Sequence, residues 1–354
     1  MSDAHVFRAP RDSHAIDADR LRDYLATAGM TLDATRTIQQ FATGLANINY
    51  RLRIDGRDVV LRRPPDGDLP PGAHDMKREH RVLSKLSKVF PPAPDSMHLC
   101  EDVSVIGVPF QIMEYRPGRV IKGDDFSFIG DDPTRARRTG EMLVDTMIAL
   151  HGVDAAHAGL AELGRPDGFI ARAVKGWRTR AERREPQGDM NRLTREIGVW
   201  LEAQTTKERA PTLLHCDLKL DNCILDPETL ELRAIVDWDM GTRGDPLFDL
   251  ATMTSYWTEA GDPECMHEMA QMPTAAPGFQ TRDEIVASYA ALTGRDVSDF
   301  PVLRVLCMFK LATVFHQLFA TYGRGPDAQA AYLGLDRLAH DMYAFTHAVM
   351  RDAG

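Results

Sequence analysis

Four polar side chains that lie close together in the sequence have the chemistry of phosphoryl transfer: Asp217, Lys219, Asn222 and Asp237. An aspartate beside an incoming hydroxyl can orient it and accept its proton, while an asparagine and a second aspartate supply the hard oxygen ligands that Mg²⁺ prefers. Asn222 follows Asp217 by five positions, which is the spacing of a kinase catalytic loop. The pattern therefore predicts transfer of a phosphoryl group from a magnesium nucleotide.

Two short apolar runs flank this loop, at 212–214 and 233–236, and we expect both to be strands. The second run leads directly into Asp237. An isolated His-x-Asp-x-x-x-x-Asn pattern is a weak signal because these residue types are common in loops. The strands on both sides and the later aspartate make it a strong one.

Composition limits the remaining possibilities. A chain of 354 residues with 44% apolar content can bury a full core, and its net charge of -10 argues against nucleic acid or an anionic membrane as a partner. The first residues lack the basic start and apolar run of a signal peptide, so we expect a cytoplasmic location. The cysteines are scattered, odd in number and without a CxxC pair, which favours reduced thiols over disulfides or a zinc site. They are Cys100, Cys216, Cys223, Cys265 and Cys307.

Six segments of the sequence resemble a known family. They resemble the aminoglycoside phosphotransferase and choline kinase group, and more closely the kinase-like domain fused to animal acyl-CoA dehydrogenases and its free-standing bacterial relatives. The similarity covers roughly residues 35–255 in the right order, and one departure is Cys216, where the family usually has glycine. The segments are HCDLKLDN (215–222) with IVDWD (235–239) and GDPLFDLA (244–251), VLRRPP (60–65) with AHDMKREH (73–80), and VIGVPFQIMEY (105–115).

The resemblance implies an α+β, two-lobed protein-kinase-like fold, with a small lobe of antiparallel strands plus a helix and a larger, mostly helical lobe. We expect a nucleotide-binding lobe over 1–114 with a covering helix at 17–29, a hinge at 115–118, and a catalytic and acceptor-binding lobe over 119–354. Alternating residues around an Asp55-Gly56 turn independently predict a hairpin in the small lobe.

A turn at 43–47 precedes the first hairpin strand. The resemblance implies that Gly44 and Asn47 lie over the nucleotide phosphates, where small residues let backbone N–H groups approach. With a single glycine, the sequence by itself favours an ordinary turn between strands.

Arg62 stands where kinases place the lysine that holds the α and β phosphates, and a guanidinium supplies the same charge with a bidentate fork. The resemblance implies that Glu79, on a following helix, orients Arg62. Arg63 is the competing assignment, because only one of two neighbouring strand residues can face the cleft. The alternative to both assignments is a solvent-exposed arginine on an edge strand. Glu79 stands in a KREHR run, where a glutamate is usually exposed.

The backbone of Met113, Glu114 and Tyr115 is expected to hydrogen-bond the adenine edge, as the linker between kinase lobes does. A plain domain linker is the alternative, and both interpretations place a boundary near residue 117.

Past this linker the pattern becomes helical. Apolar residues at three-to-four spacing predict a helix over 132–152, and the most apolar stretch, 302–322, is interrupted too often by polar residues for a membrane span, so we expect a buried helix. The RTRAERR run at 178–184 is better explained as a solvated helix face than as a site for an acidic substrate. Asp245 is expected to cap a helix and, by resemblance, to brace the catalytic loop.

These observations predict an ATP- and Mg²⁺-dependent transfer of the γ-phosphoryl group to a hydroxyl of a small molecule. Asp217 is the expected base, Lys219 the contact to the γ-phosphate, and Asn222 with Asp237 the metal ligands. Hydroxy acids or hydroxyacyl-CoA thioesters are plausible acceptors by analogy, ahead of aminoglycosides and amino alcohols. We expect a monomer or homodimer.

Two other functional classes fit the sequence less well. A nucleotide-binding pseudokinase acting as an interaction module would lack a catalytic aspartate or metal ligand, and none is missing here. A hydrolase is not supported, because the sequence has no GxSxG elbow or convincing nucleophile–base pair, and His267-Glu268 has no second histidine at zinc-protease spacing.

Overall fold

The computed structural model describes residues 7–42, 47–66, 74–123, 125–127, 130, 132–184, 186–324 and 330–353. The chain divides into two compact units. The first contains the chain up to Gly118 together with Ala156–Ala161 and Arg233–Gly241, and the second contains the rest. The contiguous part of the first unit thus ends at the last residue of the predicted hinge, whereas the sequence did not predict the two later segments.

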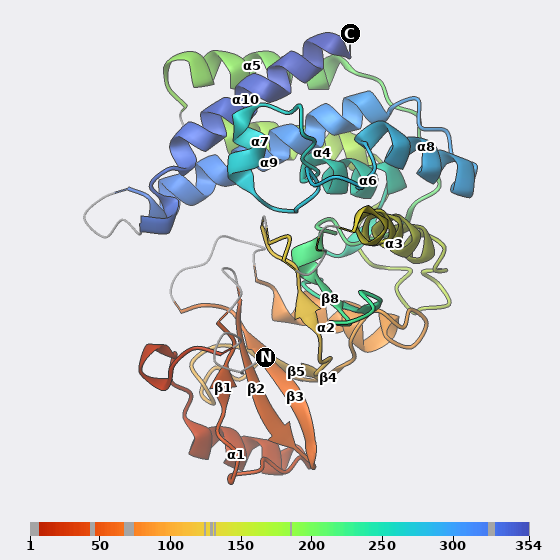
Figure 1. The fold of residues 1–354 in the computed structure, drawn as a ribbon. Helices are drawn as coiled ribbons and strands as arrows, with labels where there is room; N and C mark the ends of the chain where they lie inside the picture. The colour runs from red at the N-terminus through yellow and green to blue at the C-terminus, as the bar shows by residue number, and fades with distance from the viewer. Residues whose placement is uncertain are drawn as a thin grey trace. The chain divides into compact units, whose positions relative to one another are not determined.

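The first unit is built on a five-stranded antiparallel sheet in the order β1-β2-β3-β5-β4 (Figure 1). Its elements are α1 (Ala18–Thr27), β1 (Gln39–Gln40), β2 (Ile48–Ile54), β3 (Arg57–Arg63), α2 (Met76–Leu86), β4 (Ser96–Cys100) and β5 (Phe110–Glu114), with a 3-10 turn at Pro10–Asp12. The predicted hairpin is confirmed: β2 and β3 pair across a turn in which Asp55 and Gly56 both have positive φ, as a tight hairpin turn requires.

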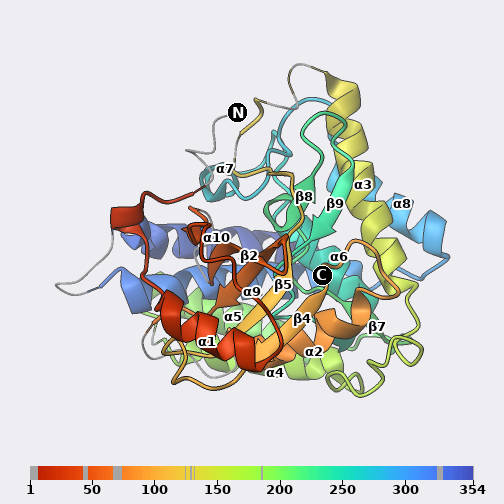
Figure 2. The same cartoon turned by 90° about the horizontal axis from the view of Figure 1, so that it is seen from below.

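The two faces of this sheet carry different side chains. On one face, Leu21 and Leu25 of α1 join Tyr50, Leu61 and Ile112 of the strands in a buried apolar cluster. Figure 2 shows α1 against the strands on this side. Helix α2 packs on β4 and β5, and its Glu79 bonds to side chains of β3 and β5. Strand alternation therefore places Leu61 toward α1 and Arg62, its neighbour in β3, toward α2.

The second unit is mostly helical. Its helices are α3 (Pro133–His151), α4 (Phe169–Glu182), α5 (Gly188–Ala203), α6 (Pro246–Ser255), α7 (Glu264–Met269), α8 (Arg282–Thr293), α9 (Phe300–Tyr322) and α10 (Leu335–Asp352), with 3-10 turns at Leu220–Asn222 and Ala330–Tyr332. Its short strands are β6 (Arg119–Val120), which pairs with β8 (Cys223–Leu225), and β7 (Thr212–Leu214), which pairs with β10 (Thr242–Gly244). Strand β9 (Leu232–Ile235) belongs to the first unit from Arg233 onward.

The long helices of this unit follow from their sequences. Asp132 caps α3 by accepting the amide of Thr134, which confirms the helix predicted at 132–152. Helix α9 is long and apolar enough to cross a membrane, but 67% of its most apolar window is buried inside the protein, as in a core helix. It lies side by side with α10 in both views (Figures 1 and 2). In α4, Arg178 pairs with Glu182 one turn on and with Glu202 of α5, so this arginine of the RTRAERR run is neutralised by carboxylates of its own helix and of the next.

Candidate active site

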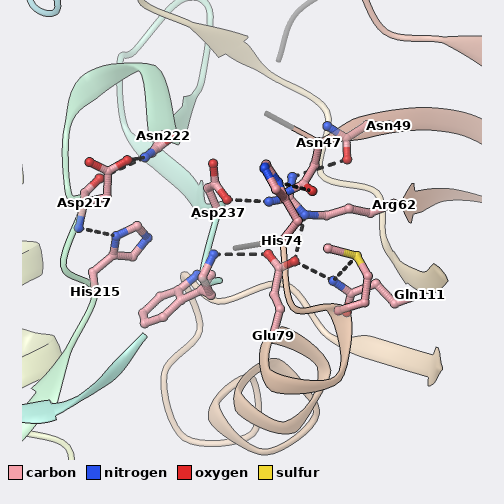
Figure 3. Close-up of polar contacts among 12 residues, drawn as sticks. Asn47, Asn49, Arg62, His74, Glu79, Gln111, His215, Asp217, Asn222 and Asp237 are labelled. Atoms are coloured by element: carbon pink, nitrogen blue, oxygen red, sulfur yellow. Dashed lines mark hydrogen bonds and ion pairs between the residues drawn. The ribbon is translucent and has the colours of Figure 1, made fainter. Parts of the chain in front are cut away.

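Arg62, near the end of β3, is the centre of a buried ion cluster in the first unit (Figure 3). Its Nε donates to Oε2 of Glu79 at 2.7 Å, and its Nη2 donates to Oδ1 of Asp237. Although burial opposes the charge, these two carboxylates raise the pKa of Arg62 above its ordinary value, so it stays protonated. One guanidinium thus faces the carboxyl groups of both Glu79 and Asp237.

Glu79 is held from several sides. Its side chain is fully buried, its Oε2 accepts from the amide of Gln111 at 2.7 Å, and its Oε1 accepts the backbone N–H of Trp238 at 3.1 Å. Gln111 is fixed in turn by the hydroxyl of Ser96 at 2.7 Å. A carboxylate with this many donors has one orientation, so Glu79 fixes Arg62 and the backbone next to Asp237 together.

Asp237 follows β9 with a backbone φ of 67°, in the left-handed region that non-glycine residues rarely adopt. Its side chain is 27% exposed and keeps a carboxylate oxygen besides the one that pairs with Arg62. A strained, partly exposed carboxylate at the end of a strand is typical of a functional position.

Arg63 lies on the other face of β3. Its Nη2 donates to Asp66 at 2.7 Å, and its neighbour in the paired strand is Ile48. Of the two arginines that the sequence left as alternatives, the structure places Arg62 among the carboxylates, and Arg63 away from them. Whether Arg62 binds phosphate stays a prediction.

Near Arg62 the structure also places Asn47, Asn49 and His74 (Figure 3). Asn47 is buried and its Oδ1 lies 2.9 Å from Nδ1 of His74, while its Nδ2 has no partner among the described residues. Burial and the nearby Arg62 lower the pKa of His74, so its imidazole is neutral at pH 7. Gly44, the other residue predicted in this turn, lies outside the described residues.

The predicted adenine contacts, Met113, Glu114 and Tyr115, lie at the end of β5 and just beyond it. Met113 pairs with Val60 of β3, and the amide of Glu114 donates to the carbonyl of Asp95 at 2.8 Å. Those interactions are internal to the sheet. The Glu114 amide is therefore already used.

Asp217 is the best-held side chain of the catalytic loop in the second unit. Its Oδ1 accepts from the Tyr256 hydroxyl at 2.6 Å, and its Oδ2 accepts from Nδ2 of Asn222 at 3.0 Å. The ammonium of Lys219 lies 3.7 Å from Oδ2. The side chain is 20% exposed, so it is not sealed off from solvent.

The charge of Asp217 is stabilised by its surroundings. Burial raises the pKa of this carboxyl, but the cations of Lys219 and Lys310 and the Tyr256 hydrogen bond outweigh burial and hold the pKa below its ordinary value. Asp217 is therefore ionised at neutral pH, as a base must be. Lys219 also donates to Oε1 of Gln271 at 3.1 Å and pairs with Asp221 at 3.3 Å.

Asp249 holds the backbone of this loop. Its Oδ2 accepts the amide of His215 at 2.8 Å and its Oδ1 accepts the amide of Cys216 at 2.7 Å. Cys216 has a φ of 67°, which explains why the resembling family usually has glycine at this position. Its carbonyl accepts from the buried ammonium of Lys310 at 2.9 Å.

The expectation that Asp245 braces the loop is corrected by these contacts. Asp245 caps α6 by accepting the amide of Leu247 at 2.9 Å and pairs with Arg209 at 3.0 Å. Because it precedes the helix, its side chain turns back onto the first helical amides. Asp249, one turn further on, faces the loop instead.

Sequence reasoning missed several polar residues that hold the two clusters. Most of them come from elements distant in sequence, and for all but one of them the local pattern gave no sign of a partner. One signal was available: a lysine within the otherwise apolar helix 302–322 needs a buried acceptor. The missed residues are Asn49, His74, Gln111, Asp249, Tyr256, Gln271 and Lys310.

The sequence of this chain matches a family model and several curated proteins. The family model described as "Phosphotransferase enzyme family" matches residues 37–285. Acyl-CoA dehydrogenase family member 10 of Mus musculus is 31% identical over 327 residues, covering 92% of this chain and 30% of that protein. Acyl-CoA dehydrogenase family member 11 of Rattus norvegicus is 28% identical over 312 residues, covering 86% of this chain and 39% of that protein. The chain thus spans about a third of the length of these curated relatives.

Solved structures share the fold. A candidate aminoglycoside phosphotransferase from Ralstonia eutropha superposes with a TM-score of 0.77 at 24% identity, covering 96% of this chain and 99% of that one. An ethanolamine kinase of Plasmodium vivax gives a TM-score of 0.59 at 10% identity, covering 91% and 85%. At these identities the likeness speaks for the fold alone, and it confirms the predicted α+β kinase-like class.

The resemblance read from the sequence is therefore confirmed. The chain belongs to the phosphotransferase enzyme family.

Proposed function

We propose that this chain transfers the γ-phosphoryl group of ATP, with Mg²⁺, to a hydroxyl of a small anionic molecule. The observation that carries the proposal is the ionised, partly exposed carboxylate of Asp217, held by Tyr256 and Asn222 beside the ammonium of Lys219. A carboxylate fixed in this way is suited to orient a hydroxyl and accept its proton as the bond to phosphorus forms.

Each remaining residue has a proposed role. Lys219 contacts the γ-phosphate, and Arg62, held by Glu79, contacts the α and β phosphates. Positioning and electrostatic stabilisation supply most of the catalysis in such a reaction, which suits a site made of carboxylates and cations.

The donor atoms of Asn222 and Asp237 suit Mg²⁺. Because Nδ2 of Asn222 is bonded to Asp217, its carbonyl oxygen is the atom left for a cation, and Asp237 keeps one carboxylate oxygen beyond its pair with Arg62. Mg²⁺ takes few protein ligands and completes its shell with water and phosphate oxygens. Bound there, the ion would neutralise phosphate charge.

The resemblance to the phosphotransferase family also suggests which residues bind the adenine base and which turn covers the phosphates. We assign binding of the adenine base to the backbone of Met113, Glu114 and Tyr115. The carbonyls and the Tyr115 amide would make the hydrogen bonds to it, because the Glu114 amide already donates to the carbonyl of Asp95. Gly44 and Asn47 are assigned to the phosphates, and the unpartnered Nδ2 of Asn47 supports this for its own side chain. Among the similar folds, a variant of an aminoglycoside phosphotransferase, with a TM-score of 0.57 at 13% identity, was solved with AMP-PNP and hygromycin B.

The acceptor is proposed to be a hydroxy acid or a hydroxyacyl-CoA thioester. The curated relatives are acyl-CoA dehydrogenase family members, which supports substrates of that chemistry.

A screen of Mg-ATP consumption tests the proposal. Purified protein is incubated with 3- and 4-hydroxy acids, their CoA thioesters, ethanolamine, simple sugars and an aminoglycoside, and phosphorylated product is detected by mass spectrometry. We expect product with a hydroxy acid or its thioester, and none when Asp217→Asn replaces the wild type. Product only with the cationic acceptors would overturn the acceptor class, and nucleotide binding without any product would favour the alternative of an interaction module.

A further inference from the structure

Tyr256 reaches the catalytic carboxylate from the C-terminal end of α6. Its hydroxyl donates to Oδ1 of Asp217 at 2.6 Å, while Asn222 donates to the other oxygen at 3.0 Å. The tyrosine is only 7% exposed, so solvent does not compete for this bond. With a fixed donor on each oxygen, the plane of the carboxylate has a single orientation.

The same helix holds the backbone that carries Asp217. Asp249, in the first turn of α6, accepts the amides of His215 and Cys216, and Tyr256 caps the helix seven residues later. Seven residues are close to two helical turns, which puts both side chains on one face. All residues of α6 are buried. One rigid helix therefore fixes both the loop backbone and the side chain at its centre.

The ring of Tyr256 makes a second contact, which a substitution can keep while removing the hydrogen bond of the hydroxyl. The ammonium of Lys219 lies 4.8 Å from the ring centre. Phenylalanine keeps this cation–π contact and the buried volume and removes only the hydroxyl. Burial, and then the charge of Asp217, raises the pKa of Tyr256, so its hydroxyl remains a donor at any pH of interest.

We propose that Tyr256 is a positioning residue, whose hydroxyl holds the carboxylate of Asp217 in the orientation that accepts the proton of the acceptor. The inference rests on the function proposed above. Tyr256 acts through Asp217, so its effect belongs to turnover and not to binding of the nucleotide.

A double-mutant cycle tests this, with water as the phosphate acceptor. Phosphate release from Mg-ATP is followed in single turnovers at high protein concentration for the wild type, Tyr256→Phe, Asp217→Asn and the double variant. Nucleotide affinity is measured by calorimetry. The control is Tyr343→Phe, which removes another buried tyrosine hydroxyl, one that donates to Thr313 at 3.0 Å.

We expect Tyr256→Phe to slow hydrolysis about tenfold or more, the factor that a hydrogen bond to a charged group supplies, with the Kd for Mg-ATP changed less than about twofold. Tyr343→Phe should keep the wild-type rate. In the Asp217→Asn background the Tyr256 substitution should have no further effect, because the carboxylate through which it acts is gone.

Three different results would each count against a different part of the proposal: the role of Tyr256, the role of Asp217, or the proposed function. A wild-type rate for Tyr256→Phe, or a loss that persists undiminished in the Asp217→Asn background, overturns the positioning role alone. Hydrolysis by Asp217→Asn at the wild-type rate removes Asp217 as the base. A wild-type chain that binds no Mg-ATP overturns the proposed function and this inference with it.

Discussion

Lys310 donates a hydrogen bond to the backbone carbonyl of Cys216 at 2.9 Å. The lysine lies in the middle of α9, the most apolar helix of the chain, and is 4% exposed. Burying an ammonium group costs free energy unless its hydrogen-bond donors are satisfied. The ammonium of Lys310 holds the catalytic loop and adds positive charge near Asp217.

Lys310→Met should slow turnover by about ten- to hundredfold, because small displacements of a catalytic loop cost that much. The free energy of unfolding should fall by less than about 2 kcal/mol, since the lost hydrogen bond is offset by removal of a buried charge. Chemical denaturation and steady-state rates measure the two effects. Lys85→Met is the matched control, because Lys85 donates to the carbonyl of Gly159 at 2.8 Å on the surface. This substitution should change neither the turnover rate nor the free energy of unfolding. Equal rates for both variants would remove the role of Lys310.

Asp217→Asn should lower turnover by roughly two orders of magnitude or more while leaving nucleotide affinity nearly intact, because the amide keeps the shape of the side chain and loses the base. Rate measurements with the acceptor found in the screen, together with calorimetry of Mg-ATP binding, separate the two effects. Comparable turnover in the variant assigns the base to another group.

Asp237→Ala should abolish the dependence of ATP binding on Mg²⁺, since it removes a metal ligand. Asp58→Ala is the matched control, because Asp58 is also paired with an arginine, Arg51, and is 28% exposed compared with 27% for Asp237. Calorimetry with and without Mg²⁺ gives the result. If the two variants bind Mg-ATP alike, Asp237 is not a ligand.

Arg62→Ala should weaken ATP binding by about one to two decades and adenosine binding much less, because only the phosphates lose a partner. Arg63→Ala should be nearly silent toward both ligands, since its guanidinium pairs with Asp66 on the other face of β3. Dissociation constants for ATP and adenosine decide between the two. An ATP-selective loss at Arg63 with none at Arg62 contradicts this assignment.

Local rules predicted the parts of this structure that depend on neighbours in the sequence. The Asp55-Gly56 hairpin, the cap at Asp132 and the buried helix 302–322 follow from turn chemistry, capping and periodicity. Strand alternation also showed that only one of Arg62 and Arg63 could face the carboxylates, although it could not say which.

Contacts between distant segments were not predictable in this way. Tyr256, Asp249 and Lys310 meet residues 215–217 only because α6 and α9 pack beside that loop, and no pattern within those helices names the partner. The prediction that Asp245 holds the catalytic loop failed for this reason. Asp245 begins α6 and Asp249 lies one turn later, and the sequence alone does not tell which of the two side chains faces the loop.

The backbone contact between Trp238 and Glu79 gives the protein an intrinsic optical probe. Trp238 is buried, packs edge-on against Phe90 at 6.2 Å and directly follows Asp237. It is one of four tryptophans, so replacing the other three with phenylalanine leaves an indole whose emission responds to changes at the neighbouring carboxylate. Stopped-flow fluorescence could then time the arrival of Mg²⁺ and nucleotide without any label and before the acceptor is known.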